Sequence, residues 1–250
     1  MARRTALVTG ASYGVGAATA LALARAGYDV AMTATRAENL RDTAAKLAAA
    51  DARVVPLVLD LRAQDSIAHA LGEALAALGS LDVLVNNAGA NLRRRAADVT
   101  PSEWDAVMDT NVTGTFFLTQ QAGRHWIAGG RPGCVVNIAS THGLVGAAER
   151  STYGISKAAI IHMTKMLAIE WAGHAIRVNA IAPGRMQTDS PSRAEKGSDP
   201  SYMAAMLARI PLHLLATAEE VAAAVCWLAS PAAASVTGHT LVMDGGLTAA

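Results

Sequence analysis

The chain has few of the residues that mark secreted or membrane proteins. Its two cysteines, Cys134 and Cys226, lie far apart in the sequence and form neither a CxxC motif nor a secreted disulfide framework. No apolar run approaches the ~20 residues that a bilayer-spanning helix needs. Arg3 and Arg4 precede an apolar run that ends after a few residues, too early for a signal peptide. We therefore expect a cytoplasmic protein that does not bind a membrane.

Aromatic side chains and excess charge are also scarce. Aromatic residues make up 4% of the 250 residues and hydrophobic residues 52%, so Ala, Val and Leu must build the core. The formal net charge of +1 gives no general attraction to nucleic acid. The seven histidines are scattered without metal-ligand spacing, so we expect no metal site. A chain of this length fits one domain that spans residues 1–250.

Seven short aliphatic runs alternate with longer segments rich in Ala and Leu. The expected strands are Ala6–Val8, Val30–Thr33, Val54–Leu59, Val83–Val85, Val135–Ile138, Arg177–Ile181 and Thr240–Val242. The expected helices are Gly16–Ala26, Leu40–Ala50, Ser66–Leu78, Glu103–Ile127, Thr152–Ala172 and Ala218–Leu228. This alternation predicts parallel strands with helices on both faces, and continuous apolar strands agree with burial on both sides. The predicted fold is therefore α/β: a single-domain, doubly wound Rossmann fold with a seven-stranded parallel sheet.

One segment interrupts this alternation. From Arg185 to about Ser201 the sequence is rich in Ser, Pro and charged residues and has no apolar period. Long irregular segments in compact domains are often lids or binding loops. Because this one directly follows an expected strand, we predict a substrate lid within residues 185–210. The alternative is a surface insertion without a role in binding.

A glycine-rich turn follows the first expected strand and opens the first expected helix. Glycines here would permit a tight turn, the close approach of a pyrophosphate and close helix–strand packing. The spacing is GxxxGxG rather than the GxGxxG of the standard dinucleotide fingerprint. Exposed N–H groups and the helix dipole would face the phosphate. The residues expected to contact a dinucleotide in this turn are Gly10, Ser12, Tyr13, Gly14, Val15 and Gly16.

The end of the second expected strand indicates which dinucleotide is bound. A carboxylate there would hydrogen-bond the ribose of NAD, whereas an arginine accommodates the extra phosphate of NADP. The sequence reads Thr35-Arg36, with no carboxylate at the strand end. Arg36 can make a charge-assisted, forked contact to a phosphate, and the Thr35 hydroxyl could assist. NADP(H) is therefore the preferred cofactor and NAD(H) stays possible; the alternative is that Arg36 is an ordinary surface residue.

Tyr153 and Lys157 lie four residues apart in an expected helix, a spacing that places both side chains on one face. A free tyrosine titrates near pH ~10, too high for proton transfer at neutral pH. A nearby ammonium favours the phenolate and would bring the pKa of Tyr153 toward the working range. Together with the glycine turn, the pair predicts nicotinamide-dependent hydride transfer.

Further motifs occur in order along the chain. They are Asp60 after the third expected strand, Asn86-Asn87-Ala88-Gly89 after the fourth, Asn111, Ser140, Pro183-Gly184-x-x-x-Thr188 and Asp244-Gly245-Gly246. With the glycine turn and Tyr153-x-x-x-Lys157, these motifs cover essentially the whole chain, and they resemble the short-chain dehydrogenase/reductase family. The resemblance includes 3-oxoacyl-carrier-protein reductases and sugar-acid dehydrogenases. It implies an NADP(H)-preferring oxidoreductase that interconverts a carbonyl and a secondary alcohol.

The resemblance also implies a role for each catalytic position. Tyr153 would be the general acid or base, and Lys157 would lower the Tyr153 pKa and bind the nicotinamide ribose. Ser140 would orient the substrate oxygen, and Asn111 would hold a water that relays protons to Lys157. Tyr13 departs from the pattern, because NADP-using relatives often carry a basic residue there. The remaining cofactor contacts would come from Asp60, Leu61, Asn87, Ala88, Gly89, Pro183, Gly184, Met186 and Thr188.

The substrate is less well defined by the sequence. His142, two residues past Ser140, is a candidate substrate contact, with a plain turn residue as the alternative. Arg93-Arg94-Arg95 could attract a carboxylate or a carrier phosphate, although a solvated surface cluster is the stronger interpretation. The resemblance leaves a 3-oxoacyl thioester and a keto-sugar acid or polyol as substrate classes and implies a homotetramer or homodimer. The alternative function is a catalytically silent NADP(H)-sensing protein of the same fold.

Overall fold

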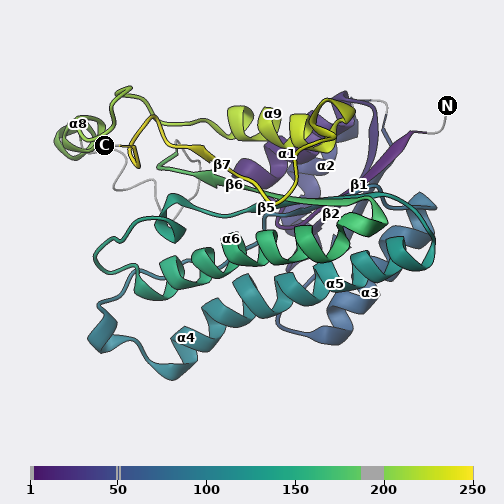
Figure 1. Cartoon of the computed structure of the whole chain (residues 1–250), viewed down its shortest axis with the longest axis horizontal. Helices are drawn as coiled ribbons and strands as arrows, with labels where there is room; N and C mark the ends of the chain where they lie inside the picture. Colours follow the sequence, from purple (N-terminus) through teal and green to yellow (C-terminus); the bar gives the residue numbers. More distant parts are fainter. Residues whose placement is uncertain (1–2, 49, 51, 187–199, 250) are drawn as a thin grey trace.

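All seven strands form one parallel sheet in the computed structural model of the chain (Figure 1). The structure describes residues 3–48, 50, 52–186 and 200–249. The strands are β1 (Arg4–Val8), β2 (Tyr28–Ala34), β3 (Val54–Val58), β4 (Val83–Asn86), β5 (Gly133–Ile138), β6 (Ile176–Pro183) and β7 (Thr240–Met243). Their order in the sheet is β3-β2-β1-β4-β5-β6-β7, so the strand order reverses between β1 and β4. The predicted seven-stranded, doubly wound fold is confirmed.

Helices cover both faces of the sheet, as the two clusters of buried side chains show (Figure 1). The helices are α1 (Gly14–Arg25), α2 (Arg41–Ala48), α3 (Gln64–Leu78), α4 (Pro101–Met108), α5 (Thr115–Ala128), α6 (Ser151–Trp171), α8 (Pro200–Leu207) and α9 (Ala218–Ala229). Side chains of α1, α2 and α9 pack on one face, and those of α3, α5 and α6 on the other. Successive residues of β1 alternate between the faces: Ala6 and Val8 belong to the first cluster and Leu7 to the second. No helix in the described part of the chain is long and apolar enough to cross a bilayer.

One predicted helix is interrupted. The expected continuous helix Glu103–Ile127 consists of α4, a π-helical turn η3 (Asp109–Gly114) and α5. It also begins earlier, because Thr100 and Glu103 form a reciprocal capping box and Pro101 occupies the first turn. The π turn has a wider hydrogen-bond spacing that the apolar period does not reveal, and such turns often occur at functional sites.

Half of the lid predicted at residues 185–210 lies outside the described residues, since 187–199 are not described. Of the remainder, Met186 pairs with Ala216 in an isolated parallel bridge. Residues 200–207 form α8, a helix that the sequence did not lead us to expect. The role of this segment therefore stays a prediction.

A chain of buried polar side chains joins the sheet to the helices on one of its faces. Asn86 of β4 donates from Nδ2 to Thr119 Oγ1 of α5 at 2.7 Å and to Asn137 Oδ1 of β5 at 2.8 Å. Asn137 in turn donates to Thr164 Oγ1 of α6 at 2.9 Å. Buried amides are costly unless they are hydrogen-bonded, so these bonds tie the part of α6 around Thr164 to β5.

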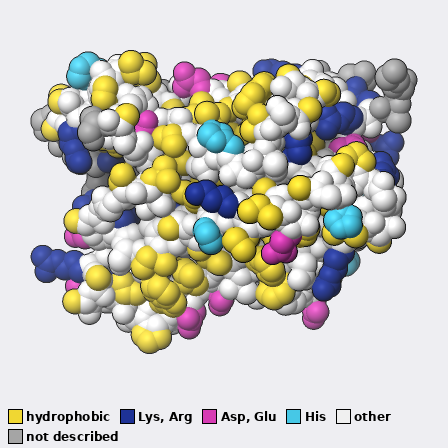
Figure 2. All heavy atoms as spheres, viewed as in Figure 1, with side chains coloured by type: hydrophobic (Ala, Val, Ile, Leu, Met, Phe, Trp, Pro, Cys, Tyr) yellow, Lys and Arg dark blue, Asp and Glu magenta, His cyan; other side chains and the backbone are white. Residues whose placement is uncertain are grey.

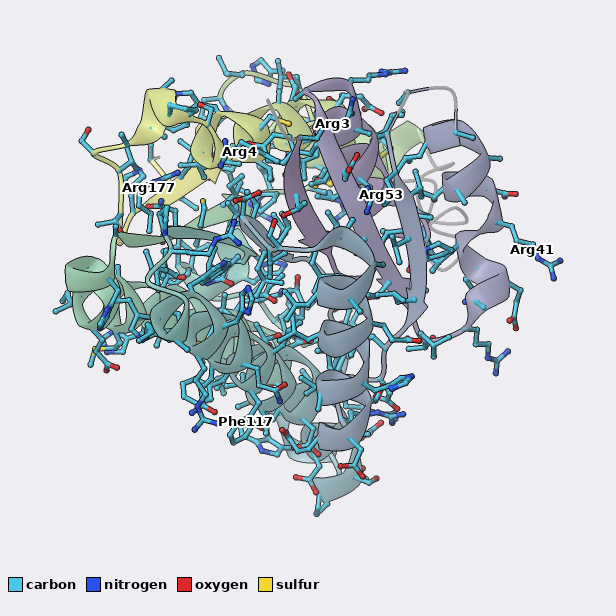
Figure 3. The ribbon with its side chains drawn as sticks, turned by 90° about the vertical axis from the view of Figure 1, so that its right-hand side faces the viewer. Arg3, Arg4, Arg41, Arg53, Phe117 and Arg177 are labelled. Atoms are coloured by element: carbon cyan, nitrogen blue, oxygen red, sulfur yellow. The ribbon has the colours of Figure 1, made fainter. Side chains whose placement is uncertain are left out.

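Several arginines lie at the end of the sheet where the strands begin. Figure 3 views the molecule from the end where the strands begin, and Arg3, Arg4, Arg53 and Arg177 lie on that side. Arg3 Nε pairs with Asp29 at 3.0 Å, and the guanidinium of Arg4 stacks 4.9 Å from the centre of the Tyr28 ring. The residues predicted to bind the cofactor and to transfer the proton are at the opposite end, where the strands finish. Ligands of open α/β sheets bind at that carboxyl end.

Candidate active site

The glycine turn between β1 and α1 brings backbone segments unusually close together. A Cβ added to Gly16 would lie 2.2 Å from Gly10 O and 2.5 Å from Asn87 Nδ2, so no side chain fits there. Gly10 and Gly14 have positive φ values of 65° and 57°, a conformation that glycine adopts without strain. The turn is joined to β2 by a hydrogen bond from Ala11 N to Thr33 O at 2.9 Å. The result is a compact cradle formed by backbone atoms.

Thr9 and Asn87 hold this cradle in shape. Asn87 Nδ2 donates to Thr9 O at 3.0 Å and to Gly10 O at 2.9 Å. Thr9 Oγ1 accepts from the backbone N–H groups of Asn87 and Ala88, both at 3.0 Å. The amide of Asn87 is thus used to tie β4 to the glycine turn. Thr9 was not among the residues predicted to contact the dinucleotide, although its position directly before the first glycine was a signal for it.

The first turn of α1 fits an anionic phosphate. Tyr13 is the N-cap residue, and no side chain caps the helix, so its first N–H groups remain available. The first turn carries no acidic residue that would repel an anion. The Tyr13 side chain is 57% exposed over the turn. Ser12 and Val15 are half-buried beside it, with Thr43 Oγ1 donating to Ser12 O at 3.3 Å. Backbone N–H groups and the helix dipole would therefore hold a pyrophosphate here.

Thr35 and Arg36 follow directly after β2, at the same edge of the sheet. Both side chains are exposed. Arg36 makes no ion pair with any acidic side chain in the described part of the chain. A forked cation free of an internal carboxylate suits the extra phosphate of NADP.

Asp60, at the adenine end of the predicted site, forms an ion pair with Arg62 that was not predicted from the sequence. Arg62 Nε donates to Asp60 Oδ1 at 3.1 Å and Arg62 Nη2 to Oδ2 at 2.8 Å. These hydrogen bonds from Arg62 hold the pKa of Asp60 below its ordinary value. The Leu61 side chain is buried in the core, so an adenine contact from Leu61 would be limited to its backbone.

Tyr153 and Lys157 lie on one face of α6 at the carboxyl end of the sheet. Lys157 Nζ is 5.7 Å from the centre of the Tyr153 ring and donates to Ile138 O, the last residue of β5, at 2.8 Å. The Lys157 side chain is buried, so this hydrogen bond fixes the position of its ammonium. The structure thus brings together the two residues on which the sequence prediction depended.

Ser140 and His142 approach the same tyrosine from the turn after β5. Ser140 Oγ accepts from the His142 backbone N–H at 3.2 Å, and the His142 ring stands edge-on to the Tyr153 ring with centroids 6.1 Å apart. The 3₁₀ turn η4 (Thr141–Gly143) packs tightly on α6. A Cβ on Gly143 would lie 2.7 Å from the Lys157 carbonyl carbon, and one on Gly154 would lie 2.8 Å from His142 O. These two glycines set the distance between the Ser140 turn and Tyr153.

Asn111 lies in the π turn, completely buried. Its Oδ1 accepts from Ala90 N at 2.7 Å, and its Nδ2 donates to Ala90 O and to Ser156 Oγ, both at 2.9 Å. Both amide N–H bonds are therefore used within the protein, and one lone pair of Oδ1 is left to accept a hydrogen bond from a water. Gly89 lies between Asn111 and Lys157: a Cβ there would be 3.1 Å from Asn111 Oδ1 and 3.5 Å from Lys157 Nζ.

The expected nicotinamide end follows β6. Pro183 is its last residue, and Gly184 packs so closely on the C-terminal segment that a Cβ would lie 2.7 Å from Asp244 Cβ. Met186 is exposed to an intermediate degree. Thr188, the last residue of this motif, lies outside the described residues.

The arginine triplet is largely engaged in ion pairs. Arg93 Nε lies 2.6 Å from Glu149 Oε2, and the Arg94 guanidinium pairs with Glu103. Arg94 N also donates to Glu149 O at 3.0 Å. Two of the three arginines therefore join the loop after β4 to the loop before α6. Within the described ranges, no three His, Cys, Asp or Glu side chains are grouped to hold a metal ion.

Known proteins resemble this chain over nearly its full length. The family model described as enoyl-(acyl carrier protein) reductase matches residues 10–248. The 2-dehydro-3-deoxy-D-gluconate 5-dehydrogenase of Escherichia coli (strain K12) is 37% identical over 97% of this chain and 94% of its own length. The 3-oxoacyl-[acyl-carrier-protein] reductase of Thermotoga maritima is 36% identical over 98% of this chain and 97% of its own.

A solved structure from Agrobacterium tumefaciens, named as a 2-deoxy-D-gluconate 3-dehydrogenase with bound NADP, has a TM-score of 0.90. It is 37% identical in sequence and covers 99% of this chain and 97% of its own. The sheet order, the glycine cradle and the tyrosine–lysine pair agree with these similarities. The chain belongs to the short-chain dehydrogenase/reductase family of oxidoreductases.

Proposed function

We propose that this oxidoreductase interconverts a carbonyl and a secondary alcohol and prefers NADP(H). The observation that supports this most directly is the meeting of Tyr153, Lys157 and the Ser140 turn at the carboxyl end of the sheet. This group lies next to a glycine cradle that suits a pyrophosphate. A phenol, an ammonium and a hydroxyl beside such a cradle provide what hydride transfer requires from a protein: orientation and proton transfer.

Tyr153 is the proposed proton donor to the substrate oxygen during reduction and the acceptor during oxidation. Ser140 would donate a hydrogen bond to the same oxygen and stabilise the negative charge that develops on it. Lys157 uses one of its three N–H bonds on Ile138 O, which leaves two for the nicotinamide ribose. A water held by Asn111 would carry protons toward Lys157. NADP(H), when bound, supplies or takes up the hydride.

The proposed cofactor site uses residues at or after the ends of five strands, β1, β2, β3, β4 and β6. Arg36 and Thr35 would contact the extra phosphate, and the exposed, unpaired state of Arg36 among the described residues supports the preference for NADP(H) over NAD(H). The remaining proposed contacts are Gly10, Ser12, Tyr13, Gly14, Val15, Gly16, Asp60, Leu61, Asn87, Ala88, Gly89, Pro183, Gly184, Met186 and Thr188.

The proposed substrate is a 3-oxoacyl thioester or a keto-sugar acid, and the related enzymes of both kinds support this range. His142 would contact the substrate beside Tyr153. Leu144 and Val145, which follow it, are 45% and 42% exposed and would cover an apolar part of the substrate. We place the enzyme in the cytoplasm, because its two cysteines are free.

Oxidation of NADPH and NADH, followed by absorbance, tests the proposal against 3-oxoacyl thioesters, keto-sugar acids and simple ketones. The expected result is reduction of one carbonyl class with a clear preference for NADPH. The corresponding alcohols with NADP+ test the opposite direction. Tight binding of NADPH without turnover in either direction would contradict the proposal and favour a dinucleotide-sensing protein.

A further inference from the structure

A short chain of hydrogen bonds connects the loop after β4 to the backbone of Tyr153. It begins at Ala90, whose N–H and carbonyl both bond the side chain of Asn111. Asn111 Nδ2 also donates to Ser156 Oγ at 2.9 Å. Ser156 Oγ then donates to Tyr153 O at 2.7 Å. Ser156 has no exposed surface, so water does not compete for the two hydrogen bonds of its hydroxyl.

The direction of every bond in this chain is determined. The Ala90 N–H can only donate, so it must face Asn111 Oδ1, and the Ala90 carbonyl must then face Nδ2. Tyr153 O can only accept, so the single hydroxyl proton of Ser156 points to it. Ser156 Oγ is left as the acceptor for the second N–H of Asn111. Rotation of any one group would leave a buried donor unsatisfied, which is costly.

We propose that Ser156 is a positioning residue that couples the loop after β4 to Tyr153 through Asn111; this inference rests on the proposed role of Tyr153 in proton transfer. Ser156 does not touch the reacting atoms. Its hydroxyl gives the Tyr153 carbonyl a second hydrogen bond. Through Asn111, this bond joins the Tyr153 backbone to Ala90 in one hydrogen-bonded unit. The intervening Gly89 lies against Lys157 Nζ, so this unit includes the surroundings of both catalytic side chains.

The coupling predicts how catalysis responds to loss of the hydroxyl. Without Ser156 Oγ, one N–H of Asn111 has no acceptor, and the amide is free to turn away from Ala90. The Tyr153 phenol would then sample positions away from the substrate oxygen, and small displacements of a catalytic group reduce the rate strongly. Substrate binding depends on other residues, so the loss should appear in kcat rather than in KM.

The same helix provides a matched control. Thr164, two turns along α6, also accepts from a buried asparagine, Asn137 Nδ2 at 2.9 Å, and donates to a helix carbonyl, Ile160 O at 2.9 Å. Like Ser156 it has no exposed surface. Its hydrogen bonds connect to β5 and not to Tyr153. Thr164→Val therefore removes an equivalent buried hydroxyl without disturbing the proposed coupling.

The test compares Ser156→Ala and Thr164→Val in the full-length enzyme, with the best carbonyl substrate and NADPH. We expect both variants to unfold at lower temperature than the wild type. Ser156→Ala should lower kcat by about tenfold or more, with KM for both substrates within about twofold. Thr164→Val should keep the wild-type kcat. If Ser156→Ala does not fold, Ser156→Cys preserves the volume and forms only weak hydrogen bonds, so it should show the same loss.

Amide hydrogen exchange gives a second readout that needs no turnover. Exchange at the Ala90 N–H should become faster in Ser156→Ala and remain unchanged in Thr164→Val. A Ser156→Ala enzyme with wild-type kcat and unchanged exchange at Ala90 would overturn the inference. If Tyr153→Phe retained turnover, the proposed function would fail, while the exchange measurement would still decide whether Ser156 holds the loop.

Discussion

Lys157 is a cation buried in the protein, with one described hydrogen bond to the Ile138 carbonyl. Burying an ammonium is costly unless its protons find acceptors, and Lys157 has three to satisfy. The ribose hydroxyls of the proposed cofactor would provide acceptors at this position. We therefore expect bound cofactor to stabilise the Lys157 ammonium at this position, and the ammonium to strengthen cofactor binding.

Arg36 decides the cofactor preference at the scale of single residues. Arg36→Ala should raise KM for NADPH much more than KM for NADH, because only NADPH carries the phosphate that the guanidinium would bind. Steady-state kinetics with both cofactors measure the two effects. Arg25→Ala, an exposed arginine at the far end of α1, is the control and should change neither value. Equal effects of Arg36→Ala on the two cofactors would contradict this role.

Glu103 makes the stability of the fold depend on pH. Hydrogen bonds from the Arg94 side chain and the Thr100 backbone lower the pKa of Glu103 from 4.5 to about 2. A carboxylate with a lowered pKa in the folded state stabilises the protein above its unfolded pKa, and the stabilisation is lost as pH falls toward the folded pKa. Glu103→Gln keeps the capping-box geometry and removes the charge.

The stability difference between wild type and Glu103→Gln should therefore shrink as pH falls from 4.5 to about 2. Urea denaturation at a series of pH values measures it. A difference that stays constant across this range would mean that the Glu103 charge does not contribute.

The π turn η3 matters at the scale of elements, because it carries Asn111 and joins α4 to α5. Gly114, at its end, has no room for a side chain: a Cβ would lie 2.0 Å from Leu61 O. Gly114→Ala must push α5 away from the loop after β3, and we expect a loss of roughly 1–3 kcal/mol in the free energy of unfolding. Reduced turnover should accompany it, since Asn111 would shift with the turn.

Gly72 provides the matched control for this substitution. It lies within α3, and a Cβ there would meet no atom within 4 Å. Gly72→Ala should stabilise the protein by about 0.5–1 kcal/mol, because alanine is the better helix former. Chemical denaturation of both variants measures the two effects. Equal changes in the free energy of unfolding for Gly114→Ala and Gly72→Ala would contradict the steric conflict expected between a side chain at position 114 and Leu61 O.

The long helix α6 was predictable, but its contacts were not. The spacing of Tyr153 and Lys157 is a local property, so a helix places them together whatever it packs against. The pairing of Asn111 with Ser156 depends on how α4, the π turn and α6 meet. No periodicity in the sequence reports a π turn within an otherwise regular apolar pattern, which explains why the helix 103–127 was expected to be continuous.

At the scale of the whole molecule, the exposed side of α6 is a candidate interface between copies of the chain. Ile155, Met166 and Ile169 are 48%, 47% and 77% exposed and lie on one side of the helix, since they are 11 and 3 residues apart. Figure 2 shows hydrophobic side chains gathered over this side of the molecule, which α4 and α6 cover. Exposed apolar surface of this kind often forms an interface. We propose that this surface is the contact between copies of the chain in the homotetramer or homodimer that the resemblance implies.

A charge placed in this surface should weaken the assembly. Ile169→Glu would have to bury a carboxylate against the partner's apolar surface, so we expect a smaller assembly by light scattering coupled to size exclusion. Ala68→Glu, on the exposed side of α3, is the control and should leave the mass unchanged. A wild-type monomer, or an Ile169→Glu variant of unchanged mass, would contradict the proposed interface.

The whole fold followed from the sequence because parallel strands are buried on both sides and appear as apolar runs. Six of the seven expected strands lie within the observed ones, and Val54–Leu59 extends one residue past β3. The glycine turn and the Tyr153–Lys157 pair were also identifiable, since each depends on local spacing, whereas the proposed roles of Ser140 and Asn111 came from the family resemblance. Contacts between distant segments were not: the hydrogen bonds of Thr9 with Asn87 and of Asn111 with Ser156 appear only when the chain is folded.

The central claim is that Tyr153 transfers the proton. The most direct measurement compares the wild type, Tyr153→Phe and Tyr28→Phe, in turnover and in the affinity for NADPH. Tyr28→Phe removes a phenol hydroxyl that donates to Ala229 O at 3.3 Å, away from the proposed site, and should keep the wild-type turnover. We predict that Tyr153→Phe lowers kcat by about 10²–10⁴-fold while NADPH binds as before. Turnover retained in Tyr153→Phe would contradict the account.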